Sequence, residues 1–384
     1  MTEIRVDTIV DAAGTGAPNF TTAPTVGGVA LGSLATSSFT SSGTAPSSPS
    51  NGAVWWDTTN SALMIYANSA WQTVTLGVLP PPPPSHYGDR GLQGPGYSAV
   101  EYSGTGNMGN TIDYWDFTTL GNASDFGDDL HYIAASSCTA GAGRGFIISG
   151  NEQGFLTANI RTILTATLGN ASQYGDIGVA KQDTCADNDA DRMFVSGFTS
   201  TDNRIEYKSI ESSANTADFG DITDNDYQSM GAASNGIRGF FMGGNGNNGR
   251  TNRICSIVIQ TTGNATDWGD LAIACMNTKA CGNDSRVLHC RGRNSTFAEF
   301  SEIYYFDTSS AGNASSFGNM GDDTYLGGMS CNETRATYSG GTGSYPNKRD
   351  QIEYVTIDTL GNGTDFGDLT KERGNTDSMS GAAS

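Results

Sequence analysis

The eight residues GNATDWGD, at positions 263–270, recur with small changes five more times in this chain, and they decide its fold class. The six copies are aligned on Asn122, Asn170, Asn215, Asn264, Asn313 and Asn362, at intervals of 48, 45, 49, 49 and 49 residues. Between the copies, short apolar runs alternate with glycine and asparagine, without helical periodicity. A repeat of this length, with room for four short strands, is typical of β-propeller blades. The sequence therefore predicts an all-β chain whose main domain is a propeller.

The strands within one repeat can be predicted from its clearest copy. We expect an inner strand at 230–234, a buried apolar strand at 238–242, a third strand at 253–260 and an outer strand around Trp268. The last residues, SMSGAAS at 378–384, resemble the inner strand SMGAAS at 229–234, whereas the first repeat, from 88–90 onward, lacks an inner strand. We therefore expect a six-bladed propeller over residues 86–384 that the C-terminal strand closes by pairing with the first blade.

Composition excludes several classes of partner. The formal net charge is −20 and the pI is about 4.3, which opposes binding to nucleic acid because that binding needs clustered Lys and Arg. There is no long apolar run, and the N-terminus lacks the pattern of a secretory signal, so we expect no membrane insertion.

The sequence predicts neither a catalytic centre nor a cofactor. The seven cysteines form no C-x-x-C pair and follow no fixed place in the repeat, so we expect reduced, buried thiols and no metal site. With three histidines, no Ser-His-Asp arrangement or histidine metal cluster is expected. Bound Ca²⁺ is conceivable in so acidic a chain, but no motif supports it. We predict that the protein is not an enzyme; a carboxylate pair that cleaves glycosides is left open.

The first 85 residues differ from the repeats. Residues 1–43 are polar and nearly uncharged, which predicts an extended arm that becomes ordered only on a partner. Residues 44–79 predict a small β module whose three tryptophans, Trp55, Trp56 and Trp71, would be exposed unless the module packs against copies of itself or another surface. The proline run within residues 80–85 predicts a stiff extended linker.

Residues repeated in every copy are expected to serve the scaffold. The repeated asparagines mostly lie in N-glycosylation patterns, but their fixed place favours side-chain hydrogen bonds within a turn. The aromatic residue that follows each asparagine is expected to pack between neighbouring blades. An arginine before each second strand could bind an anionic sugar, although pairing with backbone carbonyls or an aspartate is the preferred interpretation. These arginines are Arg144, Arg192, Arg238, Arg286 and Arg335.

Two resemblances follow from these motifs. The run Phe240–Gly244, the tyrosines Tyr207 and Tyr354 on third strands and Trp268 resemble the blades of kelch propellers, which implies a fold and little about function. The stretches VDTIVDAAGTGAPNF (6–20) and SPSNGAVWWDTTNSALMIYANSAW (48–71) resemble the N-terminal parts of tail fibres and related appendages of tailed bacteriophages.

The phage resemblance implies that the arm attaches to other virion proteins and that the distal domain meets the host. It implies a homotrimeric virion protein, assembled in the host cytoplasm, with anchoring or oligomer contacts at Val6, Ile9, Phe20, Trp55, Trp56 and Trp71. The leading hypothesis is a fibre or adhesin that binds a host surface glycan or protein through irregular loops at 92–97, 245–252, 291–296 and 342–348. The candidate receptor-binding residues are Tyr97, Asn247, Arg293, Phe297 and Tyr345.

Two alternatives remain open. One is a structural virion protein, such as a capsid-decorating fibre or a tail collar component, that binds no receptor. The other is a tailspike-like enzyme that degrades surface polysaccharide.

Overall fold

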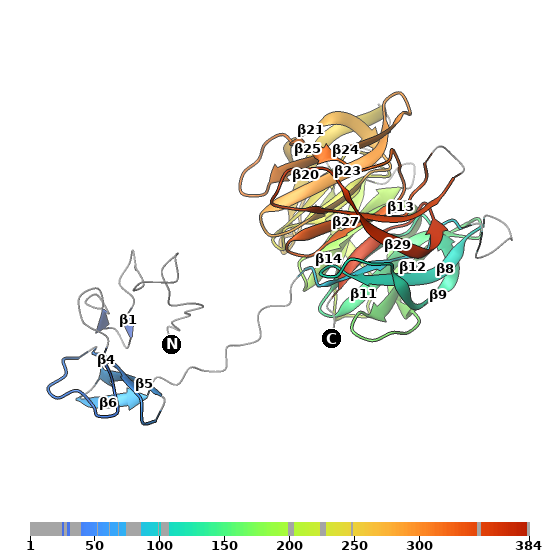
Figure 1. Ribbon diagram of the computed structural model, residues 1–384. Coiled ribbons are helices and arrows are strands. Elements are labelled where there is room, and N and C mark those ends of the chain that lie inside the picture. Colours follow the sequence, from blue (N-terminus) through green and yellow to red (C-terminus); the bar gives the residue numbers. More distant parts are fainter. Residues whose placement is uncertain are drawn as a thin grey trace. The chain divides into compact units, whose positions relative to one another are not determined.

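The computed structural model describes two compact units, Met1–Pro82 and Pro83–Ser384. The residues that it describes are 25–26, 29–30, 40–51, 53–60, 62–67, 69–73, 86–98, 100, 107–198, 203–222, 228–246, 249–343 and 347–381. Within these ranges the chain is all-β and contains no helix (Figure 1). It follows that the described part of the chain offers no apolar helix of membrane-spanning length.

The smaller unit contains a four-stranded sheet in the order β3 (Thr40–Ser42), β4 (Val54–Asp57), β5 (Ala62–Ala67) and β6 (Ala70–Thr73). The strands β4 to β6 form the expected antiparallel meander, and β3, from the segment expected to be the arm, pairs with β4 in parallel. A separate short pair joins β1 (Thr25–Val26) to β2 (Val29–Ala30).

The larger unit contains the remaining strands, from β7 to β30. Their bounds are β7 (Arg90–Gln93), β8 (Gly109–Asp116), β9 (Ser124–Ala134), β10 (Ser137–Gly141), β11 (Arg144–Glu152), β12 (Phe155–Leu164), β13 (Ser172–Asn188), β14 (Arg192–Phe198), β15 (Arg204–Ser209), β16 (Ala217–Asp221), β17 (Gly231–Ser234), β18 (Arg238–Met242), β19 (Asn245–Gly246), β20 (Gly249–Val258), β21 (Thr266–Met276), β22 (Lys279–Gly282), β23 (Arg286–Asn294), β24 (Glu299–Asp307), β25 (Ser315–Asn319), β26 (Gly328–Cys331), β27 (Arg335–Ser339), β28 (Arg349–Thr356), β29 (Thr364–Arg373) and β30 (Ser378–Gly381).

Every pair in the larger unit is antiparallel, and the strands pair in consecutive groups of four. Group 1 is β30-β7-β8-β9, group 2 is β10-β11-β12 with the first half of β13, and group 3 is the second half of β13 with β14-β15-β16. Group 4 is β17-β18-β20-β21, group 5 is β22-β23-β24-β25 and group 6 is β26-β27-β28-β29. Each group therefore begins with a short, mostly buried strand and ends with the strand that carries the repeated phrase.

The last strand of the chain completes the first group. Ser378 pairs with Gln93 and Gly381 with Arg90, so β30 lies antiparallel to β7, as the sequence predicts. Met379 of β30 is 3% exposed and packs in a cluster with Leu92 and Ile147, which joins the two ends of the repeat region through apolar contacts.

The hydrophobic core is divided into clusters that each span two consecutive groups. In one of them, Phe219 of group 3 packs with Phe241 and Ile257 of group 4. The other buried aromatic residues of the repeated phrase also belong to clusters of this kind, for example Phe126 and Phe317. The predicted packing of these aromatic residues between neighbouring groups is confirmed.

Candidate functional site

The repeated asparagine connects consecutive groups. Its side-chain oxygen accepts a hydrogen bond from the backbone N–H at the end of the phrase in the preceding copy, 3.0–3.1 Å away. The donor and acceptor pairs are Asp128 to Asn170, Asp176 to Asn215, Asp221 to Asn264, Asp270 to Asn313, Asn319 to Asn362 and Asp368 to Asn122. The expectation of a bond within its own turn is wrong, because the amide oxygen finds an unpaired N–H in the neighbouring group.

The repeated arginines also act inside the scaffold. Arg192 donates to the carbonyl of Ile259, Arg286 to that of Ile357 and Arg335 to that of Phe117, each in the following group. Each guanidinium also lies over an aromatic ring of its own group, 4.5–5.3 Å from the centroid. These contacts favour the structural interpretation of the arginines over the anionic-sugar interpretation. Arg90 belongs to the same set, bonding to Thr165, and sequence reasoning missed it because its repeat is incomplete.

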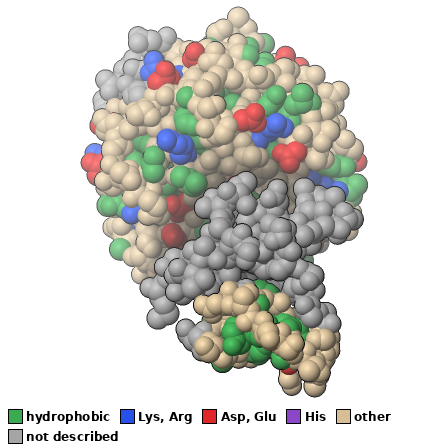
Figure 2. Space-filling model, turned by 90° about the vertical axis from the view of Figure 1, so that its left-hand side faces the viewer, with side chains coloured by type: hydrophobic (Ala, Val, Ile, Leu, Met, Phe, Trp, Pro, Cys, Tyr) green, Lys and Arg blue, Asp and Glu red, His purple; other side chains and the backbone are tan. Residues whose placement is uncertain are grey.

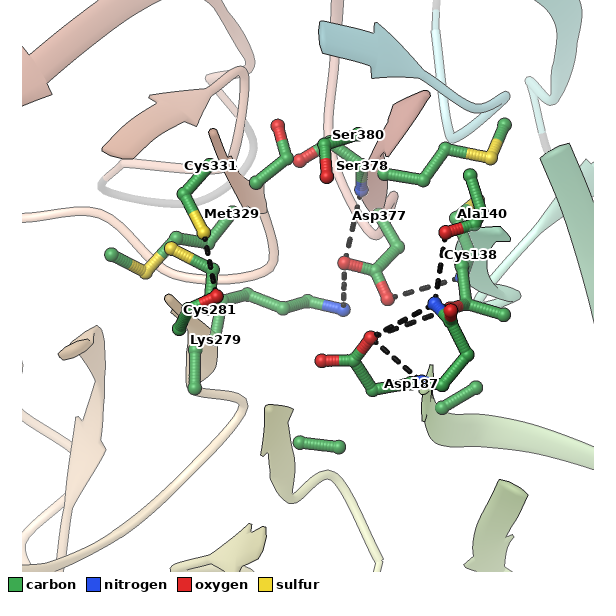
Figure 3. A pocket seen from close by; sticks show the side chains of 18 of the residues that line it. Cys138, Ala140, Asp187, Lys279, Cys281, Met329, Cys331, Asp377, Ser378 and Ser380 are labelled. Atoms are coloured by element: carbon green, nitrogen blue, oxygen red, sulfur yellow. Dashed lines mark hydrogen bonds and ion pairs between the residues drawn. The ribbon is translucent and has the colours of Figure 1, made fainter. Parts of the chain in front are cut away.

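The first strand of every group contributes to the wall of one cavity of about 40 Å³ (Figure 3). Its lining includes residues from β10, β13, β17, β22, β26 and β30, among them Thr139, Asp187, Ala232, Cys281, Ser330 and Ser380. A cavity of this size holds only a few water molecules. The cavity is therefore too small for a sugar or a cofactor.

One end of this cavity is surrounded by six residues with left-handed backbone, one ahead of each first strand. These are Ala135, Asp183, Ser229, Asn277, Leu326 and Asn375, with φ between 52° and 60°. Five of their N–H groups donate to the carbonyl of the preceding member, and Thr376 donates to Leu326, so that backbone hydrogen bonds run through all six groups. The strained conformation is held because five of these N–H groups, and that of Thr376 beside the sixth residue, each meet a carbonyl of the neighbouring group.

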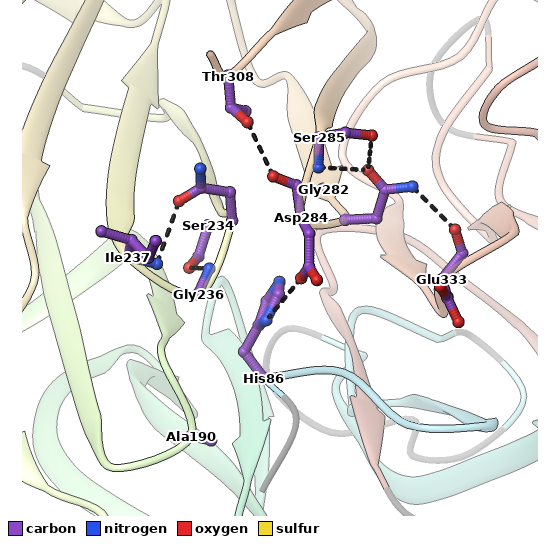
Figure 4. Close-up of polar contacts among 12 residues, drawn as sticks. His86, Ala190, Ser234, Gly236, Ile237, Gly282, Asp284, Ser285, Thr308 and Glu333 are labelled. Carbon is purple, nitrogen blue, oxygen red and sulfur yellow. Dashed lines mark hydrogen bonds and ion pairs between the residues drawn. The ribbon is translucent and has the colours of Figure 1, made fainter. Parts of the chain in front are cut away.

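The opposite end of the cavity is covered by His86. Its ring lies between the turns that carry Gly236 and Gly282, 3.9 Å from the carboxylate of Asp284 (Figure 4). Burial lowers the pKa of His86, and the Asp284 carboxylate partly opposes that shift. Gly236 has φ of +78°, and a Cβ there would lie 2.9 Å from the His86 ring, so the turn requires glycine. His86 thus fixes the first described residues of the larger unit over this end.

Charged groups line the cavity. The Lys279 ammonium lies 3.1 Å from the carboxylate of Asp377, and the Asp187 carboxylate faces the same space (Figure 3). Burial raises the pKa of Asp187 to about 7, although hydrogen bonds from the Asn188 N–H and Thr139 oppose the shift. Asp187 keeps some exposure, but only to a narrow cavity that solvates its charged form poorly.

This pKa predicts a pH dependence of stability. The folded state holds a proton on Asp187 up to about pH 7, whereas the unfolded chain releases it near the ordinary aspartate pKa of 3.8, so the wild type loses stability as pH rises through this window. Asp187→Asn should therefore gain stability relative to the wild type between acidic and neutral pH. Denaturant unfolding at several pH values measures the free energy of unfolding of both proteins. The difference between the two proteins cancels the contribution of other groups, such as His289, whose pKa burial lowers to about 3. A difference in unfolding free energy that stays constant across this pH window would contradict the raised pKa of Asp187.

The irregular connections gather at the end of the cavity opposite His86. Because the second strand of a group runs antiparallel to the first, its end lies beside the six left-handed residues, and the loop to the third strand starts there. We call this side the loop face and define it by the described residues 94–98, 107–108, 243–246, 294–298, 340–343 and 347–348. All four loops predicted from the sequence contribute to it.

The first and last of these loops are partly core. Leu92 and Gln93 belong to β7 and are fully buried, so the expectation that they lie in a loop is wrong. Tyr97 is half-buried, and its backbone exchanges hydrogen bonds with Gly374. Thr342 is buried and exchanges hydrogen bonds with Tyr325.

The structure brings Arg293 and Phe297 together with Arg250. The Arg250 guanidinium lies 3.8 Å from the centroid of the Phe297 ring, and that of Arg293 lies 3.8 Å from the centroid of Tyr325. Phe297 is 67% exposed and has φ of +65°, a strained value for a bulky residue. The Asn294 side chain holds its loop by accepting hydrogen bonds from Thr296 and Ala298. An exposed aromatic ring stacked on Arg250, with Arg293 close to that arginine, is the best-formed candidate site among the described residues.

Sequence reasoning missed Arg250 and Tyr325. Arg250 lies in the predicted 245–252 insertion, but it was not chosen as a candidate because glycine and asparagine residues dominate that stretch. Tyr325 lies between two strands where no loop was expected. The available signal was that consecutive insertions, NGNNGR (245–250) and RGRNSTF (291–297), both contain arginine.

Arg291, the start of the predicted 291–296 loop, is buried and paired with Glu353 instead of exposed. The other predicted contacts, Asn247, Tyr345, Val6, Ile9 and Phe20, lie outside the described residues.

The tryptophans of the smaller unit differ from expectation. Trp55 is 4% exposed; its indole N–H donates to the Ser42 carbonyl (3.0 Å) and its ring meets Trp71 edge-on, with centroids 5.4 Å apart. The expectation that all three tryptophans are exposed is therefore wrong for Trp55, because β3 covers it. Trp56 and Trp71 are half-buried. On the face drawn in Figure 2, hydrophobic side chains gather on the smaller unit, whereas on the larger unit they are scattered among charged ones.

All seven cysteines are free and buried, as predicted. Burial raises the pKa of the Cys185, Cys275 and Cys290 thiols to about 12, which keeps them protonated and unreactive. Within the described ranges, no three His, Cys, Asp or Glu side chains are arranged to hold a metal ion.

Comparison with known proteins adds no relative: no family model matches the chain, and no curated protein matches it.

Proposed function

We propose that residues 86–384 form a six-bladed, kelch-like β-propeller in which each group of four strands is one blade. Three observations support this proposal. The first strands of all six groups line one cavity, the hydrogen bonds of the repeated asparagine return from Asp368 to Asn122, and β30 pairs with β7. Each is what a closed ring of blades requires, because the last blade must bond to the first.

We infer further that the chain is a bacteriophage virion fibre or adhesin, in which the N-terminal arm attaches to the particle and the propeller binds a host surface glycan or protein. The observation that carries this inference is the loop face, where an exposed, strained Phe297 lies beside Arg250 and Arg293 while the repeated residues are used inside the scaffold. Variable loops grouped on one side of a rigid repeat are a common basis of recognition. The resemblance of residues 6–20 and 48–71 to phage appendages supplies the virion context.

The proposal includes a homotrimer that forms through the arm and no enzymatic activity. The half-buried Trp56 and Trp71 leave apolar surface for such contacts, although less than expected because Trp55 is covered. Sedimentation velocity of the full chain at micromolar concentration should show a trimer, and a monomer would contradict this part.

A structural virion protein is the second candidate, favoured by one observation. Phe155 is 78% exposed, and Leu130 and Leu156 are 49% and 43% exposed, on β9 and β12, the two strands that pair with β11. Exposed apolar side chains of this kind suit a protein partner better than a sugar.

The adhesin proposal is tested by cell binding. The full chain, fluorescently labelled, should bind saturably to the bacterial strain that supports the particle and should block adsorption of the particle. The polysaccharide of those cells should keep its length. If the chain neither binds nor competes, the structural-virion function becomes the better one, and shortened polysaccharide would instead identify an enzyme.

A further inference from the structure

The loop face contains arginines that the scaffold does not neutralise. Arg250 stacks on Phe297, and among the described residues no carboxylate pairs with it; its Nε is buried without a hydrogen-bond partner. Arg293 stacks on Tyr325, and its Nε is likewise buried without a partner, while one terminal nitrogen lies 3.3 Å from Glu299. The two guanidinium groups therefore carry two positive charges against one carboxylate.

The positions of these arginines follow from strand pairing. Arg250 lies in β20 and Arg293 in β23, and both strands pair with the end of β21, where Cys275 faces Thr251 and Met276 faces Arg293. The shared neighbour strand brings the arginines of groups 4 and 5 together. Burial lowers the pKa of Arg250, and the positive charge of Arg293 adds to that shift. A bound anion would relieve this repulsion.

Beside these arginines lies an aromatic ring that is largely exposed. Phe297 is covered on one side by Arg250, yet two thirds of it remains exposed. An exposed aromatic face beside hydrogen-bond donors is suited to stack on a sugar ring.

We propose that Arg250, Arg293 and Phe297 form a subsite for an acidic sugar, with its carboxylate or phosphate oxygens bound by the two guanidinium groups and its ring packed on Phe297. This inference rests on the proposed receptor-binding function and names the class of receptor. A guanidinium presents N–H donors in a fork that matches either oxyanion.

The proposed ligand carries a single acidic group and is not a polyanion. The chain has a net charge of −20, which repels extended polyanions such as nucleic acid. At physiological ionic strength this repulsion is screened beyond about 8 Å, so an anion in contact with the arginines is governed by the nearby charges, which are the two guanidinium groups and the Glu299 carboxylate. The arrangement therefore selects a sugar with one local charge in an otherwise neutral glycan.

Ligand-observed NMR on the full chain tests the subsite with glucuronic acid, N-acetylneuraminic acid and glucose 6-phosphate, against glucose as the neutral sugar. At least one acidic sugar should show saturable binding that glucose does not match. Comparison of the carboxylates with the phosphate identifies the preferred oxyanion. If no acidic sugar binds at tens of millimolar, or if glucose binds equally well, the subsite is overturned.

Substitutions locate the binding. Arg250→Gln and Arg293→Gln should each weaken acidic-sugar binding about tenfold or more, the effect of losing a charge-assisted hydrogen bond. Phe297→Ala should weaken it as well. Arg144→Gln is the matched control, because Arg144 also stacks on an aromatic ring, 5.3 Å from the centroid of Tyr174, but lies in group 2 outside the subsite; it should bind like the wild type. Thermal melts check that each variant folds.

The same variants separate this inference from the proposed function. If the wild type binds host cells and Arg250→Gln and Arg293→Gln bind equally well, the acidic-sugar subsite is wrong and the adhesin proposal stands. If the wild type does not bind cells but binds the acidic sugars with the expected dependence on both arginines, the subsite stands and the adhesin proposal fails.

Discussion

Removal of residues 378–384 should abolish the cooperative folding of the larger unit, although it shortens the chain by only seven residues. The deletion removes β30, which supplies the first strand of group 1 and leaves β7 unpaired on one side. Met379 is buried, and the loss of this side chain by itself costs about 2–5 kcal/mol of folding stability. Gln93, fully buried, would also lose its hydrogen bonds to Thr376 and Asp377 if these residues shift with the new terminus.

Thermal unfolding followed by circular dichroism measures this effect. Truncation after Gly381 is the matched control, because it shortens the same terminus but keeps all of β30 and should leave the melting temperature unchanged. A synthetic peptide with the sequence of residues 377–384 should restore part of the lost stability when added to the deletion variant. A deletion variant that melts within a degree or two of the wild type would show that β30 does not hold the two ends together.

The repeat architecture could be predicted because its signals occur in every copy. The eight-residue phrase marks the last strand of each group, and an arginine marks the second, so strands such as β18 were predicted at their observed bounds. The partner of the repeated asparagine could not be predicted, because an amide oxygen can accept from its own turn or from a neighbour equally well. Only the folded chain brings Asp368 to Asn122, 246 positions apart.

The candidate site was predictable only in part. Irregular insertions marked the loop face, and Arg293 and Phe297 were chosen from them. Their partner Arg250 depends on the pairing of β20 and β23 with one strand, which a single repeat does not reveal. The exposure of Trp55 was also wrong, because the parallel strand β3 has no alternating apolar pattern and was not expected.

Buried ion pairs between groups escaped sequence reasoning for the same reason. Arg161 pairs with Asp129, Lys181 with Glu206 and Arg373 with Asp113, each across the boundary between two groups. One member of each pair (Asp113, Arg161 or Glu206) lies at the same place in the third strand of its group, but its charge is not the same in each, so the sequence does not indicate its partner. Apolar clusters cross the same boundaries, so these ion pairs supplement the apolar packing and do not replace it.

Arg373→Met should destabilise the larger unit by about 3–5 kcal/mol, the cost of leaving one member of a buried ion pair without its partner. The Arg373 guanidinium lies 2.8 Å from Asp113 and donates to the carbonyl of Thr111 at 2.7 Å, and both charged side chains are at most 1% exposed. Asp113 also accepts hydrogen bonds from the N–H and hydroxyl of Thr370, which hold it in place when the arginine is gone. Its charge would then remain buried and only partly compensated.

A double-mutant cycle in denaturant unfolding tests this account. Asp113→Asn keeps an oxygen for Thr370 but removes the charge, so the double variant Arg373→Met, Asp113→Asn should be more stable than Arg373→Met alone. Arg349→Met is the control for loss of an arginine from an exposed pair with Asp322, and it should cost no more than about 1 kcal/mol. If Arg373→Met costs as little as this control, the pair contributes nothing to the junction. If it costs several kcal/mol and the double variant recovers part of that loss, the buried charge pair between β29 and β8 helps to join the last group to the first.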